Sequence, residues 1–236
     1  MDANRKDKSI KSIIVELKFL SNPSALKGMA SFGITPGKAY GVAIPELWRM
    51  AKSIGKDHEI AASLWAYGYR ETQILASMVD DVRYVTEEQM EQWVSEFDYW
   101  EICDQCCMNL FEDMPCAYEK AAEWSHREEE FVKRAGFVLM ARLAVSDKEA
   151  SDERFIAFFP MIKEGALDKR NFVKKAVNWA LRQIGKSNLS LNSRAIELAE
   201  ELQQTDSISA RWVAADAIRE LTGEKVQKKL ESKKAK

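Results

Sequence analysis

The stretch FVKKAVNWALRQIG, residues 172–185, decides the fold because two other stretches of the chain resemble it. FVKRAGFVLMARLA (131–144) precedes it by about 41 residues, and SARWVAADAIRELT (209–222) follows it by about 38. In all three, apolar residues recur at spacings of three and four, which is the period of a helix with one buried face. Another helical segment precedes each of them, so the sequence predicts a helix pair that repeats about every forty residues.

A helix pair of this period is typical of HEAT or armadillo-like repeat proteins, in which stacked pairs form an α-α superhelix. The composition agrees, because ten glycines and five prolines among 236 residues offer little turn chemistry for a many-stranded β fold. We therefore predict an all-α HEAT/armadillo-like superhelix whose second helices line a concave basic groove. One repeat domain is expected over residues 1–225, followed by a basic C-terminal tail over residues 226–236.

The N-terminal half shows the same helical periodicity. SIIVELKFLS (12–21) predicts an amphipathic helix. The Gly/Pro-rich stretch SFGITPGKAYGVAIP (31–45) predicts a connector, and Pro45 suits the first turn of the helix that follows it. HEIAASLWAYGYRETQILASMV (58–79) fits either one long helix or two helices divided near Gly68.

The four cysteines lie within fourteen residues, and Cys103 and Cys106 form a CxxC pair. A zinc site would need two more ligands at recognisable spacing, but His58 and His126 are isolated in the sequence. A thioredoxin-like site would need a βαβ context, which is missing. We therefore expect buried or partly buried thiols and no metal. Reduced thiols, together with the lack of a signal peptide or a membrane-length apolar run, indicate a cytoplasmic protein.

A cationic stripe runs along residues 169–186, where Lys175, Trp179, Arg182 and Lys186 follow one another at spacings of four, three and four. A single Trp on a helix is usually a packing residue. Here, however, it cannot face the core without burying the cations beside it. Such a face fits nucleic acid, with cations on phosphates and the indole against sugar or base. The net charge of −2 does not oppose this, because basic residues can cluster on one face.

FDYWEICDQCCMNLF (97–111) carries the second unusual pattern, because Trp100 and Asp104 are four apart and share one side of a predicted helix. An exposed Asp with Trp100 in the core would be the ordinary reading. The alternative is a carboxylate beside an aromatic wall, available to stabilise positive charge. The residues alone leave both readings open.

In order along the chain, AYGVAIPELWRMAK (39–52), YWEICD (99–104), FVKRAGFVLMARL (131–143) and FVKKAVNWALRQIGK (172–186) resemble the alkylpurine DNA glycosylases of the AlkD type. These HEAT-like proteins form the DNA alkylation repair enzyme family. The resemblance covers roughly residues 10–220, and its strongest parts are Trp-x-x-x-Asp at Trp100 and Asp104 and Lys-Ala-x-x-Trp-x-Leu-Arg from Lys175 to Arg182.

The resemblance implies a role for each matched residue. Asp104 matches the catalytic aspartate, Trp100 and Trp179 match the aromatic residues that cradle the deoxyribose, and Arg134 matches an arginine near the carboxylate and the DNA backbone. The implied DNA-binding residues are Lys133, Lys175, Arg182, Lys186 and Phe32. Phe32 stands where the family often has a Tyr, so stacking there would lack the hydroxyl.

The implied activity is monofunctional hydrolysis of the N-glycosidic bond of positively charged alkylpurines, such as 3-methyladenine and 7-methylguanine, in duplex DNA. The expected partner is double-stranded DNA that contains alkylated purines. No cofactor, metal or membrane is expected, and the protein is expected to be a monomer. Two other readings stay open: a non-catalytic HEAT-type DNA-binding module and a protein-interaction scaffold.

Overall fold

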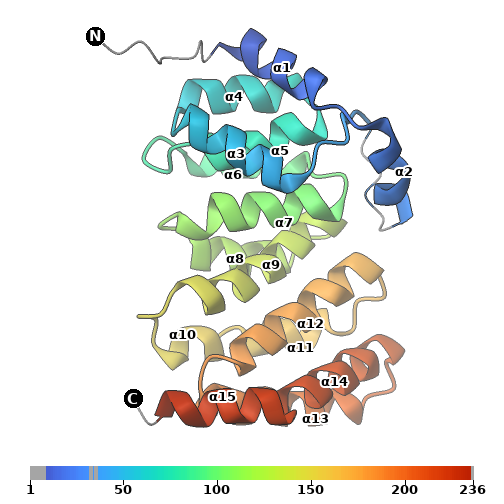
Figure 1. The fold of residues 1–236 in the computed structure, drawn as a ribbon. Helices are drawn as coiled ribbons and strands as arrows, with labels where there is room; N and C mark the ends of the chain where they lie inside the picture. The colour runs from blue at the N-terminus through green and yellow to red at the C-terminus, as the bar shows by residue number, and fades with distance from the viewer. Residues whose placement is uncertain (1–8, 32–33, 35–36, 235–236) are drawn as a thin grey trace. The chain divides into compact units, whose positions relative to one another are not determined.

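The computed structural model describes residues 9–31, 34 and 37–234, and within these residues every regular element is helical (Figure 1). The predicted all-α class is therefore confirmed. None of the helices in this part of the chain combines the length and apolar character that a membrane span requires. The contacts divide the chain into two compact units, Met1–Asp113 and Met114–Lys236, which are described separately.

The elements of the first unit are α1 (Ile10–Phe19), α2 (Pro23–Ser31), α3 (Ile44–Ile54), α4 (His58–Tyr67), α5 (Arg70–Val79), α6 (Glu87–Ser95), α7 (Trp100–Asn109) and the 3-10 turn η1 (Phe111–Asp113). The unit contains a row of contacting helices, α3, α5 and α7, with α4 packed on α5. Pro45 lies in the first turn of α3, as predicted. Gly68 ends α4 in the left-handed conformation, with φ of 72°, so residues 58–79 form two helices.

A tryptophan pair joins the two outer helices of this unit, α4 and α6. The rings of Trp65 and Trp93 stack with centroids 4.0 Å apart and an interplanar angle of 4°. Trp65 Nε1 also donates to Glu96 Oε2 at 2.7 Å, which satisfies the polar end of a buried indole. Helix α4 therefore packs on α5 and is tied to α6 through this tryptophan pair.

The second unit continues the helix pairs. Its elements are α8 (Ala117–Ser125), α9 (Glu130–Ser146), α10 (Asp152–Ile156), α11 (Phe159–Gly165), α12 (Asn171–Gly185), α13 (Leu189–Gln203), α14 (Ile208–Leu221) and α15 (Glu224–Lys234). The helices α9, α12 and α14 contact one another in succession, while α8, α11 and α13 pack on them as outer partners. These three inner helices are the three similar stretches of the sequence (Figure 1).

Hydrogen bonds between successive inner helices reveal the length of the repeat. In the second unit, the bonds from Arg134 to Phe172 and from Asn178 to Asp216 both span 38 residues. In the first unit, the Arg70–Glu101 bond between α5 and α7 spans only 31 residues. The Trp65–Glu96 bond between α4 and the end of α6 spans 31 residues as well. The forty-residue period therefore holds for the second unit, and the first unit has a shorter repeat.

The C-terminal end differs from the expected tail. The predicted boundary at residue 226 falls inside α15, which contacts α13 and α14. Leu230 of α15 is 1% exposed, so this helix contributes to the core of the second unit. The single repeat domain over residues 1–225 stays a prediction.

Candidate functional site

Helix α7 of the first unit begins at Trp100 and carries Asp104 one turn later. Tyr99 precedes the helix in an extended conformation, with φ of −156° and ψ of 165°. Trp100 and Asp104 are both half-buried, and their four-residue spacing places them on the same side of the helix. An indole and a carboxylate therefore lie next to each other on one partly accessible face.

A buried ionic network ties α7 to the rest of the first unit. Arg70 binds Glu101, the second residue of α7, through two hydrogen bonds of 2.6 and 2.7 Å. Arg70 also donates to Glu71 Oε1 and to the Val42 carbonyl oxygen, both at 2.9 Å. Burial would lower the pKa of Arg70, but the two carboxylates outweigh burial and raise it. The guanidinium therefore stays charged inside the protein.

The same network holds the N-terminal connector. Glu71 is fully buried and accepts hydrogen bonds from the backbone N–H groups of Tyr40, Gly41 and Val42, at 2.8 to 3.2 Å. The connector motif AYGV is therefore fastened to α5, and through Arg70 to α7. Sequence reasoning missed this network, although an adjacent Arg-Glu pair inside an apolar segment was its signal.

The cysteines of α7 belong to the core. Cys103, Cys106 and Cys107 are buried, Cys116 is partly buried, and none forms a disulfide. Burial raises the pKa of the Cys106 and Cys107 thiols well above its usual value, which keeps them protonated. The expected buried or partly buried thiols are confirmed.

Helix α12 of the second unit carries the predicted cationic stripe, whose members differ in environment. Lys175 is exposed and forms no ion pair with any residue that the structure describes. Trp179 is half-buried and makes no hydrogen bond or ring–ring contact within that same set. Both therefore remain accessible on this helix.

Arg182 and Lys186, in contrast, are paired with acids of α14. Arg182 binds Glu220 Oε2, and its Nε lies 3.5 Å from Asp216 Oδ2. Lys186 Nζ lies 2.6 Å from Glu220 Oε1. Burial alone would raise the pKa of Glu220, but the hydrogen bonds from these two cations outweigh it and lower the pKa. The C-terminal half of the stripe is therefore neutralised by α14.

Lys133 and Arg134, the predicted site residues of α9, are less open than expected. Arg134 is only 5% exposed, and its Nη1 donates to the carbonyl oxygen of Phe172 at 2.6 Å, which joins α9 to α12. Lys133 lies with its Nζ 3.9 Å from Asp168 Oδ2. A DNA-binding role for either residue stays a prediction, and Phe32 lies outside the described residues.

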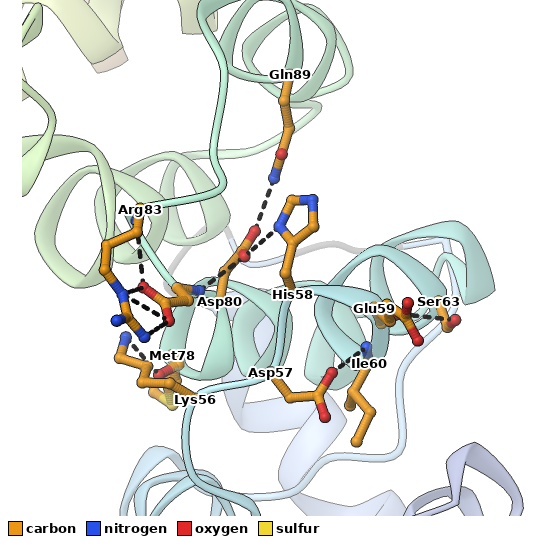
Figure 2. Close-up of polar contacts among 11 residues, drawn as sticks. Lys56, Asp57, His58, Glu59, Ile60, Ser63, Met78, Asp80, Arg83 and Gln89 are labelled. Atoms are coloured by element: carbon orange, nitrogen blue, oxygen red, sulfur yellow. Dashed lines mark hydrogen bonds and ion pairs between the residues drawn. The ribbon is translucent and has the colours of Figure 1, made fainter.

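His58 is isolated from other possible metal ligands in the sequence, but in the structure it lies beside Asp80. His58 Nδ1 lies 2.7 Å from Asp80 Oδ1, and Gln89 Nε2 donates to Asp80 Oδ2 at 2.7 Å; Figure 2 marks both contacts with dashed lines. The Asp81 backbone N–H donates to Asp80 as well, so this buried carboxylate is well satisfied. Across the described residues, no group of three or more His, Cys, Asp or Glu side chains has an arrangement that could hold a metal ion.

The predicted site residues fall into two sets. Trp100 and Asp104 lie together in the first unit, and the remaining described residues lie in the second. The set in the first unit combines an indole with a carboxylate, and the set in the second unit combines cations with an indole. Their convergence in a single site remains a prediction.

Comparison with known proteins identifies relatives that match most of the chain. The family model described as DNA alkylation repair enzyme matches residues 13–221. One solved structure, from a family related to the HEAT-like repeat DNA glycosylases with affinity for branched DNA structures, is 20% identical with a TM-score of 0.74. That match covers 89% of this chain and 94% of the other.

A second solved structure, described as a predicted DNA alkylation repair enzyme from Enterococcus faecalis, is 17% identical with a TM-score of 0.65. The match covers 88% of this chain and 99% of that one. At these identities the two structures support the fold, and they confirm the HEAT-like architecture. No curated protein sequence matches the chain.

Proposed function

Since the chain belongs to the DNA alkylation repair enzyme family, we propose that it is a monofunctional DNA glycosylase acting on positively charged alkylpurines. Substrates such as 3-methyladenine and 7-methylguanine in duplex DNA would release the free base and leave an abasic site. The observation that carries this proposal is the Trp100–Asp104 pair on one partly accessible side of α7.

The proposed chemistry needs little acid catalysis. Alkylation makes the base a cation, so it is already a good leaving group, and bond breaking builds positive charge on the sugar. The reaction then resembles glycoside hydrolysis through an oxocarbenium-like transition state without the general acid. The Asp104 carboxylate would stabilise that charge and orient the attacking water.

Aromatic faces would complete the environment of the sugar. Trp100 lies one turn before Asp104, so its ring can flank the same sugar. The accessible indole of Trp179 would supply a second ring face, because aromatic rings attract positive charge to their faces. This role requires the two units to bring Trp179 to the sugar that Asp104 faces.

The cations of the second unit would hold the DNA backbone. Lys175 is exposed and ready to contact a phosphate, while Arg182 and Lys186 would exchange Glu220 for phosphate oxygens. Lys133 and Arg134 would contribute at the start of α9, next to the Asp168 and Phe172 contacts that fix them.

The decisive experiment incubates the protein with methylated duplex DNA and measures released 7-methylguanine and 3-methyladenine. We expect Asp104→Asn to slow release by about 100-fold or more, the scale of losing a preorganised electrostatic group. Glu59→Gln, which removes an exposed carboxylate on α4, should release base at the normal rate. No release by the wild type would refute the glycosylase, and equal release by Asp104→Asn would refute the role of Asp104.

A second candidate is a non-catalytic DNA-binding module. The solved structure at 20% identity favours it, because its family is described by affinity for branched DNA structures. Tight binding of methylated or branched DNA without base release would select this candidate. A scaffold for proteins would bind neither DNA.

A further inference from the structure

A hollow of about 690 Å³ opens in the second unit where α14 begins. The loop between α11 and α12 supplies Leu167 and Lys169, α12 supplies Lys174, and the start of α14 supplies Ile208. Lys174 directly precedes Lys175 of the stripe on α12, although Lys175 itself does not line the hollow. None of the residues proposed above as catalytic lines it.

The rim of the hollow is unusually apolar for an exposed surface. Ile208 is 80% exposed, Leu167 is 50% exposed, and Trp212, one turn after Ile208, is 40% exposed. Single exposed apolar residues are common on protein surfaces, whereas a cluster of large ones usually marks an interaction site. Ile208 and Trp212 share one side of α14, so they form a continuous apolar strip.

Cations lie directly beside this strip. The Lys174 ammonium is 4.7 Å from the centre of the Trp212 ring, over its face. Neither Lys169 nor Lys174 forms an ion pair with a described residue, and among the lining residues the single acid is Asp206. The start of α14 adds the positive end of a 14-residue helix. The hollow is therefore cationic as well as apolar.

We infer that this hollow binds an unpaired DNA strand that leaves a duplex held by the protein. Lysines that alternate with exposed aromatic and aliphatic side chains suit single-stranded nucleic acid, because phosphates and base faces are both available there. A duplex offers its phosphates but turns its base faces inward, so the apolar strip would gain nothing from it. This inference rests on the proposed DNA binding and names the substrate class as a duplex with an unpaired flank.

The test compares binding of a plain duplex with that of the same duplex carrying a short single-stranded flank. We expect the wild type to bind the flanked DNA about tenfold more tightly, the scale of stacking one or two bases. Trp212→Ala should remove this gain and leave duplex binding unchanged, while Trp212→Phe should keep most of it. Trp48→Ala, which removes a 48% exposed indole from α3, is the matched control and should keep the whole gain.

Charge variants give a second readout. Lys169→Ala combined with Lys174→Ala should lower the salt dependence of flanked-DNA binding by about 1.4 in log–log slope, the value for two lost contacts to a single strand. Asp206→Asn should tighten flanked-DNA binding.

The possible failures are distinguishable. Equal affinity of the wild type for both DNAs would overturn this inference and leave the proposed glycosylase standing. A gain that survives Trp212→Ala would also overturn it, as would a change of oligomeric state in that variant, which would assign the strip to self-association. Absence of binding to any DNA would overturn the proposed function as well.

Discussion

The ammonium nitrogen of Lys186 lies 2.6 Å from Glu220 Oε1, and this contact joins the end of α12 to α14. The other oxygen of the same carboxylate binds Arg182. One acid therefore pairs with both of the cations that we propose to hold the DNA backbone. Any phosphate that binds them has to displace Glu220 first, so this residue sets how strongly the stripe attracts DNA.

We predict that Glu220→Gln strengthens DNA binding. The substitution keeps the shape of the side chain but frees the charge of both cations for phosphates. The expected gain is about fivefold, equivalent to the ~1 kcal/mol of a partly exposed ion pair. Fluorescence anisotropy with labelled duplex DNA measures it, and the gain should shrink as salt is raised.

Glu201→Gln is the matched control for this prediction. Glu201 of α13 accepts an ion pair from Lys163 at 2.8 Å, and both side chains are more than half exposed on the outer helices. Its removal should leave the affinity unchanged. An unchanged affinity in Glu220→Gln as well would exclude Arg182 and Lys186 from the DNA interface.

Acid should destabilise the second unit through Asp168. Burial would raise the pKa of this carboxyl, but Arg170 and Lys133 outweigh burial and lower the pKa below its usual value. The unfolded chain then binds a proton near pH 4, before the folded protein does. The contribution of Asp168 is therefore complete above about pH 4 and is lost as the pH falls through its lower folded pKa.

Asp168→Asn should remove this part of the pH dependence. The amide oxygen can still accept the 2.9 Å hydrogen bond from the Arg170 backbone N–H, so the turn is retained. Urea unfolding at pH values from about 3 to 6 should show a flatter stability curve for the variant. Two parallel curves would contradict the assignment to Asp168.

Close packing of α8 on α9 depends on Gly136. A Cβ at this position would lie 2.5 Å from the backbone nitrogen of Ser125 and 2.9 Å from the carbonyl oxygen of Ala121. Because backbone atoms cannot move aside alone, Gly136→Ala should push the helices apart and cost about 1–3 kcal/mol of unfolding free energy. Thermal or urea unfolding measures the loss.

Gly28→Ala gives the matched comparison, because Gly28 is also helical but an alanine methyl group there would meet no atom within 4 Å beyond its chain neighbours and the backbone of its own helix. Alanine has the higher helix propensity, so this variant should be neutral or more stable by up to about 1 kcal/mol. Equal destabilisation by both substitutions would show that the α8–α9 contact is not the cause.

The fold could be predicted because its repeat is visible in the sequence. The inner helices α9, α12 and α14 carry similar apolar patterns, and hydrogen bonds that span 38 residues join each of them to the next. The 31-residue spacing of the first unit was not predicted, because its helices share a packing geometry without sharing recognisable residues. Periodicity identifies a helix and its buried face, but it does not identify which other helix packs against that face.

The contacts of the candidate site were harder to predict, because the sequence does not show which distant residues meet after folding. The cations Arg182 and Lys186 are evident on one stripe, whereas Glu220 lies 38 and 34 residues further along and becomes their partner only through folding. Arg134 looks like a surface cation in the sequence, yet a carbonyl oxygen of the next repeat accepts its hydrogen bond and buries it. The charge pattern therefore identified the cationic face of α12, but only the structure identified the acid of α14 that pairs with it.

The last prediction concerns Arg70, whose side chain is 1% exposed between two carboxylates. Arg70→Met fits the space but leaves Glu71 and Glu101 buried without a counter-ion, which typically costs about 3–5 kcal/mol. Arg49 is the matched control, because it also binds two glutamates, Glu46 and Glu16, but is half exposed. Arg49→Met should cost less than about 1 kcal/mol, since water replaces the lost partners. Urea unfolding of both variants measures the contrast, and similar losses would show that the buried network does not hold α7 in place.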